Sequence, residues 1–317
     1  MTSDVSHRAA LLAAEPLRPA GPRRGFATGT LDSLRDLAAH RELLGMLVRR
    51  ELKARYKDST LGFVWSLLRP LAMLGIYYIV LGQFMGAARG IPGFAIFIFA
   101  GLTAWGFYSE TISAGTGSIV ANSGLVKKVY LPREVFPLAS VGSSLFNFAM
   151  QMIILLLGTV LVGQVPTGSR WLYAVLALAV LLVYSLALGL VLGAVNVYLR
   201  DVQYLVEIAI MIFMWVSPIV YSWHFVVDAL GRTSMSASTQ SALMEVYLAN
   251  PATLAVLGFQ KTFWVAGDTP DPSMGFVPHP ISDLALRLGV ALAVGVVLLW
   301  VAQRVFARLQ ANFAQEL

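Results

Sequence analysis

Long apolar stretches separated by polar segments run through the chain from residue 63 onward. An α-helix rises about 1.5 Å per residue, so about 20 residues are needed to cross roughly 30 Å of hydrocarbon. Six stretches meet this length, and they predict spans near 63–85, 93–112, 136–162, 171–195, 203–222 and 284–305. The pattern therefore predicts an all-α integral membrane protein with six transmembrane helices.

Residues 31–62, just before the first span, predict an amphipathic helix. Apolar residues recur there close to helical spacing, and arginine and lysine fill most other positions. This pattern is typical of an interface helix that lies in the membrane plane and binds anionic headgroups, although a cytoplasmic helix packed on protein fits it too. The basic residues nearest the first span are Arg49, Arg50, Lys53, Arg55 and Lys57.

The segment between the fifth and sixth spans, residues 223–283, mixes polar and apolar positions. Its middle part, 243–265, is apolar and helical in pattern, but Asn250, Pro251 and Lys261 interrupt it and it is too short to span. A pair of external re-entrant half-helices, forming a gate, would satisfy its backbone groups in the outer leaflet. A small external cap packed on the loops fits the same pattern.

Positive charge predicts the orientation, because lysine and arginine are retained on the cytoplasmic side. With the N-terminus inside, 17 of the 23 Lys and Arg residues fall inside. We therefore expect a multi-pass protein of the plasma (inner) membrane with both termini cytoplasmic. Residues 1–30 lack periodicity and any apolar run of signal-peptide length, so they predict a flexible cytoplasmic tail.

Composition narrows the possible chemistry. Hydrophobic residues make up 57% of the chain, and cysteine is absent, which excludes disulfides, thiolate catalysis and iron–sulfur clusters. The net charge of +6 lies mainly near membrane boundaries, where anionic lipid accounts for it, so we expect no nucleic-acid partner. The chain has no GxxxxGK[ST] phosphate loop and no HExxH motif, and its four histidines are scattered along the sequence. It is therefore predicted to be non-catalytic, without a metal site.

Two segments carry a resemblance to a known family. Arg55–Leu74 reads RYKDSTLGFVWSLLRPLAML, and Lys127–Pro137 reads KKVYLPREVFP. They resemble the first-span signature and the cytoplasmic connection between spans two and three of ABC-2 type permeases that export polysaccharides such as O-antigen, capsule, teichoic acid and cell-wall galactan. The resemblance covers the whole chain and implies a transmembrane domain over 63–317. It implies a channel-forming permease homodimer that moves lipid-linked polysaccharide, O-antigen-like or cell-wall galactan, with two copies of a separate ATPase. ATP and Mg would be bound by that ATPase, with no cofactor on this chain.

The resemblance also assigns a coupling role to the second segment. The turn and short helix there would fit a groove on the ATPase, although the charges alone also fit a positive-inside anchor. The candidate coupling residues are Lys127, Lys128, Tyr130, Pro132, Arg133 and Glu134.

Aromatic residues in the first and fifth spans are candidates for a path that glycan follows. Aromatic rings stack on sugar rings, but the same residues also suit a lipid-facing belt. Arg69 stands where family members more often carry a neutral polar residue; it either meets a substrate phosphate or extends to the headgroups. The candidates are Trp65, Arg69, Tyr77, Tyr78, Phe84, Phe213, Trp215 and Tyr221.

Acidic residues define the remaining alternatives. Glu110 and Glu207 lie within predicted spans, where acids are either functional or paired with a cation such as Arg69. A membrane-embedded transferase acting on polyprenyl-linked sugars would use external acids, for which Asp268, Asp271 and Asp283 are the candidates. An ABC-2 exporter of drugs or small lipids would share the architecture predicted here.

Overall fold

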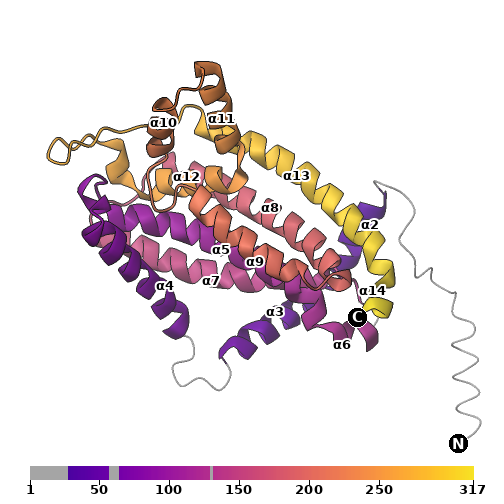
Figure 1. Ribbon diagram of the computed structural model, residues 1–317. Coiled ribbons are helices and arrows are strands. Elements are labelled where there is room, and N and C mark those ends of the chain that lie inside the picture. The colour runs from indigo at the N-terminus through magenta and orange to yellow at the C-terminus, as the bar shows by residue number, and fades with distance from the viewer. Residues whose placement is uncertain (1–27, 57–63, 129–130) are drawn as a thin grey trace, which may run out of the picture.

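The computed structural model describes residues 28–56, 64–128 and 131–317. Most of these residues are helical, the helices are joined by turns and loops, and Asp271 and Phe276 form an isolated β-bridge (Figure 1). Five helical elements are long and apolar enough to cross a membrane. They are α4 (Val64–Tyr77) with its π-helical continuation η1 (Tyr78–Phe84), α5 (Phe94–Ala121), α7 (Val135–Leu161), α8 (Arg170–Tyr198) and α13 (Leu284–Leu309). By length and composition these helices match the first four predicted spans and the sixth, and their place in a membrane stays a prediction.

The fifth predicted span, 203–222, is shorter than expected. Helix α9 (Val202–Val216) has 15 residues, which is about 22 Å of helix. It ends because Ser217 precedes Pro218, and the proline ring disfavours helical geometry at the residue before it. Ser217 accordingly has an extended backbone, with φ −81° and ψ 145°.

The segment after α9 contains a helix pair where half-helices were predicted. Helices α11 (Ala237–Ala249) and α12 (Pro251–Phe263) meet at an angle of 78° and would count as one broken span or a re-entrant loop. Asn250 accepts a hydrogen bond from Ala252 N through its side chain and caps α12, and Pro251 occupies the first helical position. The re-entrant position in a membrane stays a prediction.

The core of the molecule is built by α5 and α8, which run side by side with α7 and α13 flanking them (Figure 1). Helix α12 packs into this bundle against α5, α8 and α13, and nearly all of its residues are buried. Small residues let α5 and α8 approach closely: a Cβ atom on Gly193 would lie 2.7 Å from the carbonyl oxygen of Gly115. The external segment is thus partly a component of the core.

The predicted N-terminal helix, 31–62, is divided in the described residues into α2 (Thr28–Ala39) and α3 (Arg41–Tyr56), with a turn at His40. Helix α3 packs on α7, where the Val48 side chain faces Gly142 closely enough that a Cβ atom there would lie 2.7 Å away. One face of α3 therefore contacts protein. Its place in the membrane plane stays a prediction.

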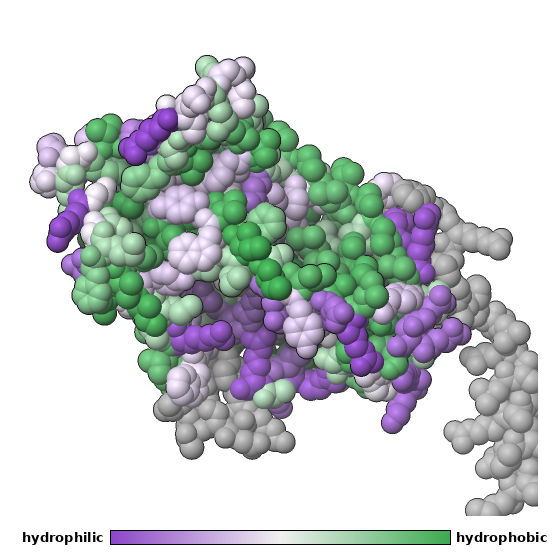
Figure 2. Space-filling view, in the orientation of Figure 1, coloured by the Kyte–Doolittle hydropathy of each residue, from purple (hydrophilic) through white to green (hydrophobic). Residues whose placement is uncertain are grey.

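Polar and apolar residues separate on the surface. Figure 2 shows hydrophilic residues gathered along the lower edge around α3, with apolar residues over the flank of α13. Exposed apolar side chains on α13 include Leu286, Val290, Val294 and Val297. The remaining described helices are α6 (Ser123–Lys128), α10 (His224–Gly231), α14 (Phe313–Glu316), and the 3₁₀ turns η2 (Ala87–Arg89), η3 (Val265–Asp268) and η4 (Gln310–Asn312).

Candidate transport and coupling sites

The predicted coupling residues fall into two environments. Lys127 and Lys128 are exposed at the end of α6, whereas Pro132 and Arg133 are half-buried. Glu134 is only 5% exposed and lies directly before α7. Tyr130 lies outside the described residues. The two lysines are therefore the members of the set most open to a partner.

Glu134 faces the C-terminal end of the chain. Burial raises the pKa of its carboxyl group, and hydrogen bonds with the side chains of Gln303 and Gln310, together with the nearby Arg304 guanidinium, oppose that rise. Arg304 itself donates from Nε to Gln303 Oε1 at 2.8 Å. Next to this contact, the Arg133 guanidinium lies 5.6 Å from the centre of the Phe313 ring. The start of α7 is thus joined to the end of α13 and to α14.

The same network reaches the N-terminal helix. Gln303 Nε2 donates to Ser33 Oγ at 3.0 Å, and Trp300 Nε1 donates to Thr30 Oγ1 at 3.1 Å. Phe306 and Phe313 are fully buried in an apolar cluster shared by α3, α5, α6, α7, α8, α13 and α14. The sequence analysis named none of these C-terminal partners. The available signal was the pair of polar residues 303–304 directly after the apolar run 288–302.

The basic residues of α3 are also divided. Arg49 and Lys53 are exposed and Lys57 lies outside the described residues, while two of the set turn toward protein. Arg50 donates to the side chain of Asn122, and Arg55 Nη1 lies 2.5 Å from Glu110 Oε1. The basic face therefore combines exposed cations with cations committed to α5.

Glu110 has a cationic partner, but this partner is Arg55 and not Arg69. Asn147 Nδ2 also donates to Glu110 Oε1, at 2.6 Å, and one turn of α3 earlier Ser143 Oγ donates to Glu51 Oε2 at 2.9 Å. This polar seam between α3, α5 and α7 satisfies an acid that would otherwise be costly near a membrane. The pairing interpretation of Glu110 is confirmed, and Asn147 was missed by the sequence analysis.

The predicted path residues lie on helices with few buried positions. Helix α4 has no buried residue, and Val206 is the one buried residue of α9. Tyr77 and Tyr221 are half-buried, and the Tyr221 hydroxyl donates to Val216 O at 2.7 Å. The exposed members of the set are Trp65, Arg69, Tyr78, Phe84, Phe213 and Trp215. Helices α4 and α9 both pack on α5, whereas Tyr221 lies in the segment between α9 and α10.

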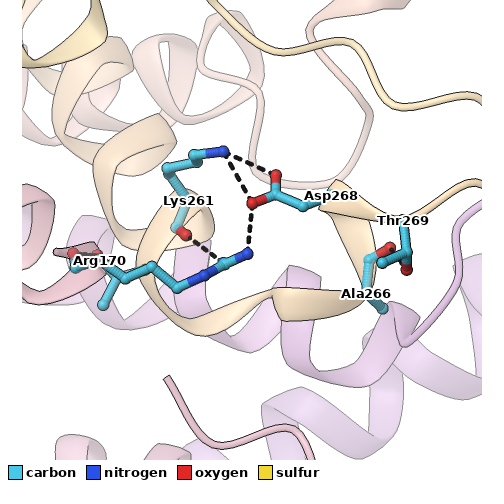
Figure 3. A network of polar contacts seen from close by, with 6 residues as sticks. Arg170, Lys261, Ala266, Asp268 and Thr269 are labelled. Atoms are coloured by element: carbon cyan, nitrogen blue, oxygen red, sulfur yellow. Dashed lines mark hydrogen bonds and ion pairs between the residues drawn. The ribbon is translucent and has the colours of Figure 1, made fainter. Parts of the chain in front are cut away.

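A charge network fixes the far end of α12 (Figure 3). Lys261 Nζ lies 2.8 Å from each carboxylate oxygen of Asp268, and Arg170 Nη2 contacts the same carboxylate. Arg170 Nη1 also donates to Lys261 O at 2.8 Å, while Thr262 Oγ1 donates to Arg170 O at 3.0 Å. One acid and two cations thereby tie α12 and η3 to the start of α8.

The external acids do not form a catalytic group in the described part of the chain. Asp268 is committed to two cations, while Asp271 accepts hydrogen bonds from the backbone N and Oγ of Ser273 in a local turn. Asp283 precedes α13 with a positive φ of 57°. Within residues 28–56, 64–128 and 131–317, no set of three His, Cys, Asp or Glu side chains could hold a metal ion. The geometry therefore gives the transferase alternative no support.

We expect Asp268→Asn to loosen α12 from α8. The substitution removes the carboxylate and leaves two cations facing each other, so we expect a loss of about 1–2 kcal/mol, between values for exposed and buried pairs. Thermal unfolding of the purified protein measures this loss. Asp271→Asn is the matched control, since its carboxylate serves only a local turn. Equal unfolding temperatures for the two variants would contradict the assigned role.

Two histidine rings, one on α10 and one in the segment before α13, lie against each other in a tilted arrangement. The ring centres of His224 and His279 are 3.4 Å apart, and His224 Nδ1 lies 3.3 Å from Asp228 Oδ1. Partial desolvation and the neighbouring His224 lower the pKa of His279 from its usual 6.5, against the opposing effect of Asp228. Protonation of His279 is therefore less favourable in the folded protein than in the unfolded chain.

Stability should consequently depend on pH. A histidine whose pKa is lowered by folding contributes fully above 6.5, and this contribution is lost as the pH falls through the lower, folded value. We expect the unfolding temperature of the native chain to fall by roughly 1–2 °C more than that of His279→Phe between pH of about 8 and about 5. His40→Phe is the control and should show the same fall in unfolding temperature as the native chain. If His279→Phe also shows the same fall as the native chain, the prediction is refuted.

These elements together define the class of protein. Membrane-length helices, a basic N-terminal helix on the bundle surface and an inserted helix pair describe a multi-pass membrane protein. The model of the ABC-2 type transporter family matches residues 42–264. The chain therefore belongs to the ABC-2 type transporter family.

The chain is also similar to individual members of this family with known names. The chain is 31% identical over 284 residues to an O-antigen export system permease protein, RfbA, of Myxococcus xanthus, covering 90% of this chain and 98% of the relative. It is 28% identical to an RfbA of Klebsiella pneumoniae over 57% of this chain and 69% of that protein. It is 25% identical to the polysialic acid transport protein KpsM of Escherichia coli, over 56% and 69% respectively.

Proposed function

We propose that the chain is the permease subunit of an ATP-driven exporter that moves a lipid-linked polysaccharide from the cytoplasm across the plasma membrane. The alignment with an O-antigen export permease over nearly the full length of both proteins carries this proposal. The capsule-type relative shares the same general cargo, a polysaccharide, by its name. The chain itself is non-catalytic and forms part of the route.

The driving force comes from a separate ATPase, which binds ATP and Mg. This chain carries no phosphate loop, so it needs a partner to hydrolyse ATP. The exposed Lys127 and Lys128 follow α5 at the end of the bundle that also carries α3 and α14, which suits a docking surface. Both termini are cytoplasmic in this arrangement, because the positive charge then lies inside.

Two copies of the chain form the transport path with two ATPases. Helices α4 and α9 have almost no buried residues in a single copy, and apolar side chains cover their exposed faces. A two-fold homodimer would cover part of these faces and place the exposed aromatic residues along a path between copies. Rings such as Trp65 and Trp215 stack on sugars without requiring one pattern of hydroxyl groups.

The α11–α12 pair closes the outer end of this path as a re-entrant gate. The support is its 78° bend, the burial of α12 in the bundle and the exposure of most of α11. The Arg287 side chain on α13 holds α11 through a bidentate contact with Glu245. Arg287 Nη1 donates to Glu245 Oε2 at 2.7 Å, and Arg287 Nη2 donates to Glu245 Oε1 at 2.8 Å. Opening therefore requires α11 to leave this contact while α12 stays in the core.

Depletion of the protein in its own cell tests the proposal. Surface polysaccharide should fall, and lipid-linked glycan should accumulate on the cytoplasmic side. Restoring the native gene should reverse both effects, while an ATPase lacking its phosphate-loop lysine should reproduce the depletion. Unchanged export without internal accumulation would contradict the proposal, and new drug sensitivity with normal surface glycan would favour a drug or small-lipid exporter.

A further inference from the structure

Two opposite charges stand on the sparsely buried helices of the bundle. Arg69 projects from α4 and Glu207 from α9, and both side chains are exposed. Within residues 28–56, 64–128 and 131–317, neither has an ion-pair or hydrogen-bond partner. Glu110, the other acid within a predicted span, instead forms an ion pair with Arg55. The two charges therefore lack the compensation that a charge within a membrane span requires.

Both charges lie in the first part of their helices. Glu207 is the fifth residue after Val202, where α9 begins, which is about 7.5 Å along the helix axis. Arg69 is the fifth residue after Val64, the first residue of α4 that the structure describes. Since both helices run outward from the cytoplasmic side in the proposed orientation, both charges lie toward the cytoplasmic half of the bundle.

The structure of one copy keeps these helices on separate sides of α5. Helix α4 packs against α5 and α7, whereas α9 packs against α5 and α8. The neighbouring exposed residues are apolar, including Leu68 and Met73 on α4 and Ile208 and Met211 on α9. Each face is thus an apolar strip with one charge, and the two strips carry opposite signs.

We propose that Arg69 of one copy pairs with Glu207 of the partner subunit across the two-fold axis of the homodimer. This proposal rests on the homodimer of the proposed function and adds the contact that sets its register. Two-fold symmetry produces the pair twice, because residue contacts are reciprocal in such an interface. The second copy thereby supplies the missing partner of both charges, near the cytoplasmic end of the transport path.

The absence of cysteine from the sequence makes the contact directly testable. Arg69→Cys is introduced into a copy with one affinity tag and Glu207→Cys into a copy with another, and both are produced together with the ATPase. A short bifunctional thiol reagent applied to membranes should give a cross-linked species carrying both tags. Ile76→Cys paired with Glu207→Cys is the matched control, since Ile76 is exposed on α4 about two turns away. This control should cross-link at least tenfold less.

Charge exchange provides a second measurement. Arg69→Glu and Glu207→Arg should each reduce recovery of the second tagged copy and export at least tenfold, because each variant brings like charges together. The combined variant should restore both readouts, which a purely local role of either residue would not allow.

The outcomes separate this proposal from the one on which it rests. Tagged copies that purify together without an Arg69→Cys to Glu207→Cys cross-link would overturn the pair while leaving the homodimer. Copies that never purify together, with export intact, would overturn both. A third sample, one copy carrying both Arg69→Cys and Glu207→Cys, tests for contact within a chain. A cross-link inside this copy, with none between the separately tagged copies, would also overturn the proposal.

Discussion

Gly193→Val should remove most of the folded protein from the membrane. A Cβ atom at Gly193 would lie 2.7 Å from the carbonyl oxygen of Gly115, and this oxygen belongs to backbone that cannot rotate away. The opposing contact is also close, since a Cβ on Gly115 would lie 3.0 Å from the Cα of Gly189. Because α5 and α8 form the centre of the bundle, their separation would disturb the whole core. We expect a loss of about 3 kcal/mol, the upper range for overpacking.

The measurement is the amount of protein in the membrane together with its unfolding temperature in detergent. Gly289→Val on α13 is the matched control, because nothing lies within 4 Å of a Cβ atom there. The control should retain near-native levels. If both variants reach the same level, the α5–α8 contact does not limit stability as the structure indicates.

Glu134→Ala should detach the C-terminal end of the chain from the start of α7. The substitution leaves the half-buried amide groups of Gln303 and Gln310 and the almost fully buried Arg304 guanidinium beside an empty site. Removing one member of a buried charged network costs about 3 kcal/mol. Trypsin cleavage after Arg308, in the last turn of α13, should therefore accelerate at least tenfold. Export should fall with it, since the predicted coupling segment adjoins this network.

Two further variants distinguish this effect from a general loss of acidic charge. Glu134→Gln preserves most of the hydrogen-bonding shape and should retain more than half of the native protection. Glu316→Ala removes an exposed acid from α14 and should leave cleavage unchanged. Native cleavage rates in Glu134→Ala would show that the network does not hold the C-terminal end.

The membrane spans could be predicted from sequence because the requirement is local. About 20 consecutive apolar residues suffice to satisfy it, and the predicted and observed ends of 136–162 and α7 differ by one residue. The predicted end of the fifth span, residue 222, was wrong for an equally local reason. Ile219 and Val220 continue the apolar pattern, but Ser217 before Pro218 ends the helix, and this signal was present in the sequence.

The candidate sites were less predictable because their contacts join distant parts of the chain. Glu110 meets Arg55 from a position 55 residues away, and Glu134 meets the end of α13 far along the sequence. Hydropathy and charge identify such residues as unusual but not their partners. The burial of α12 has the same origin, since its apolar surface is covered by α5, α8 and α13 together.

Reconstitution tests the central claim most directly. The purified chain and its ATPase are placed in lipid vesicles that carry a lipid-linked glycan on the side of the ATPase, and access of a glycan-cleaving enzyme is followed on that side. ATP should make the glycan resistant to cleavage by moving it to the opposite side, and an ATPase without its phosphate-loop lysine should not. Glycan that stays cleavable with all components active, or that moves equally in vesicles lacking this chain, would contradict the account.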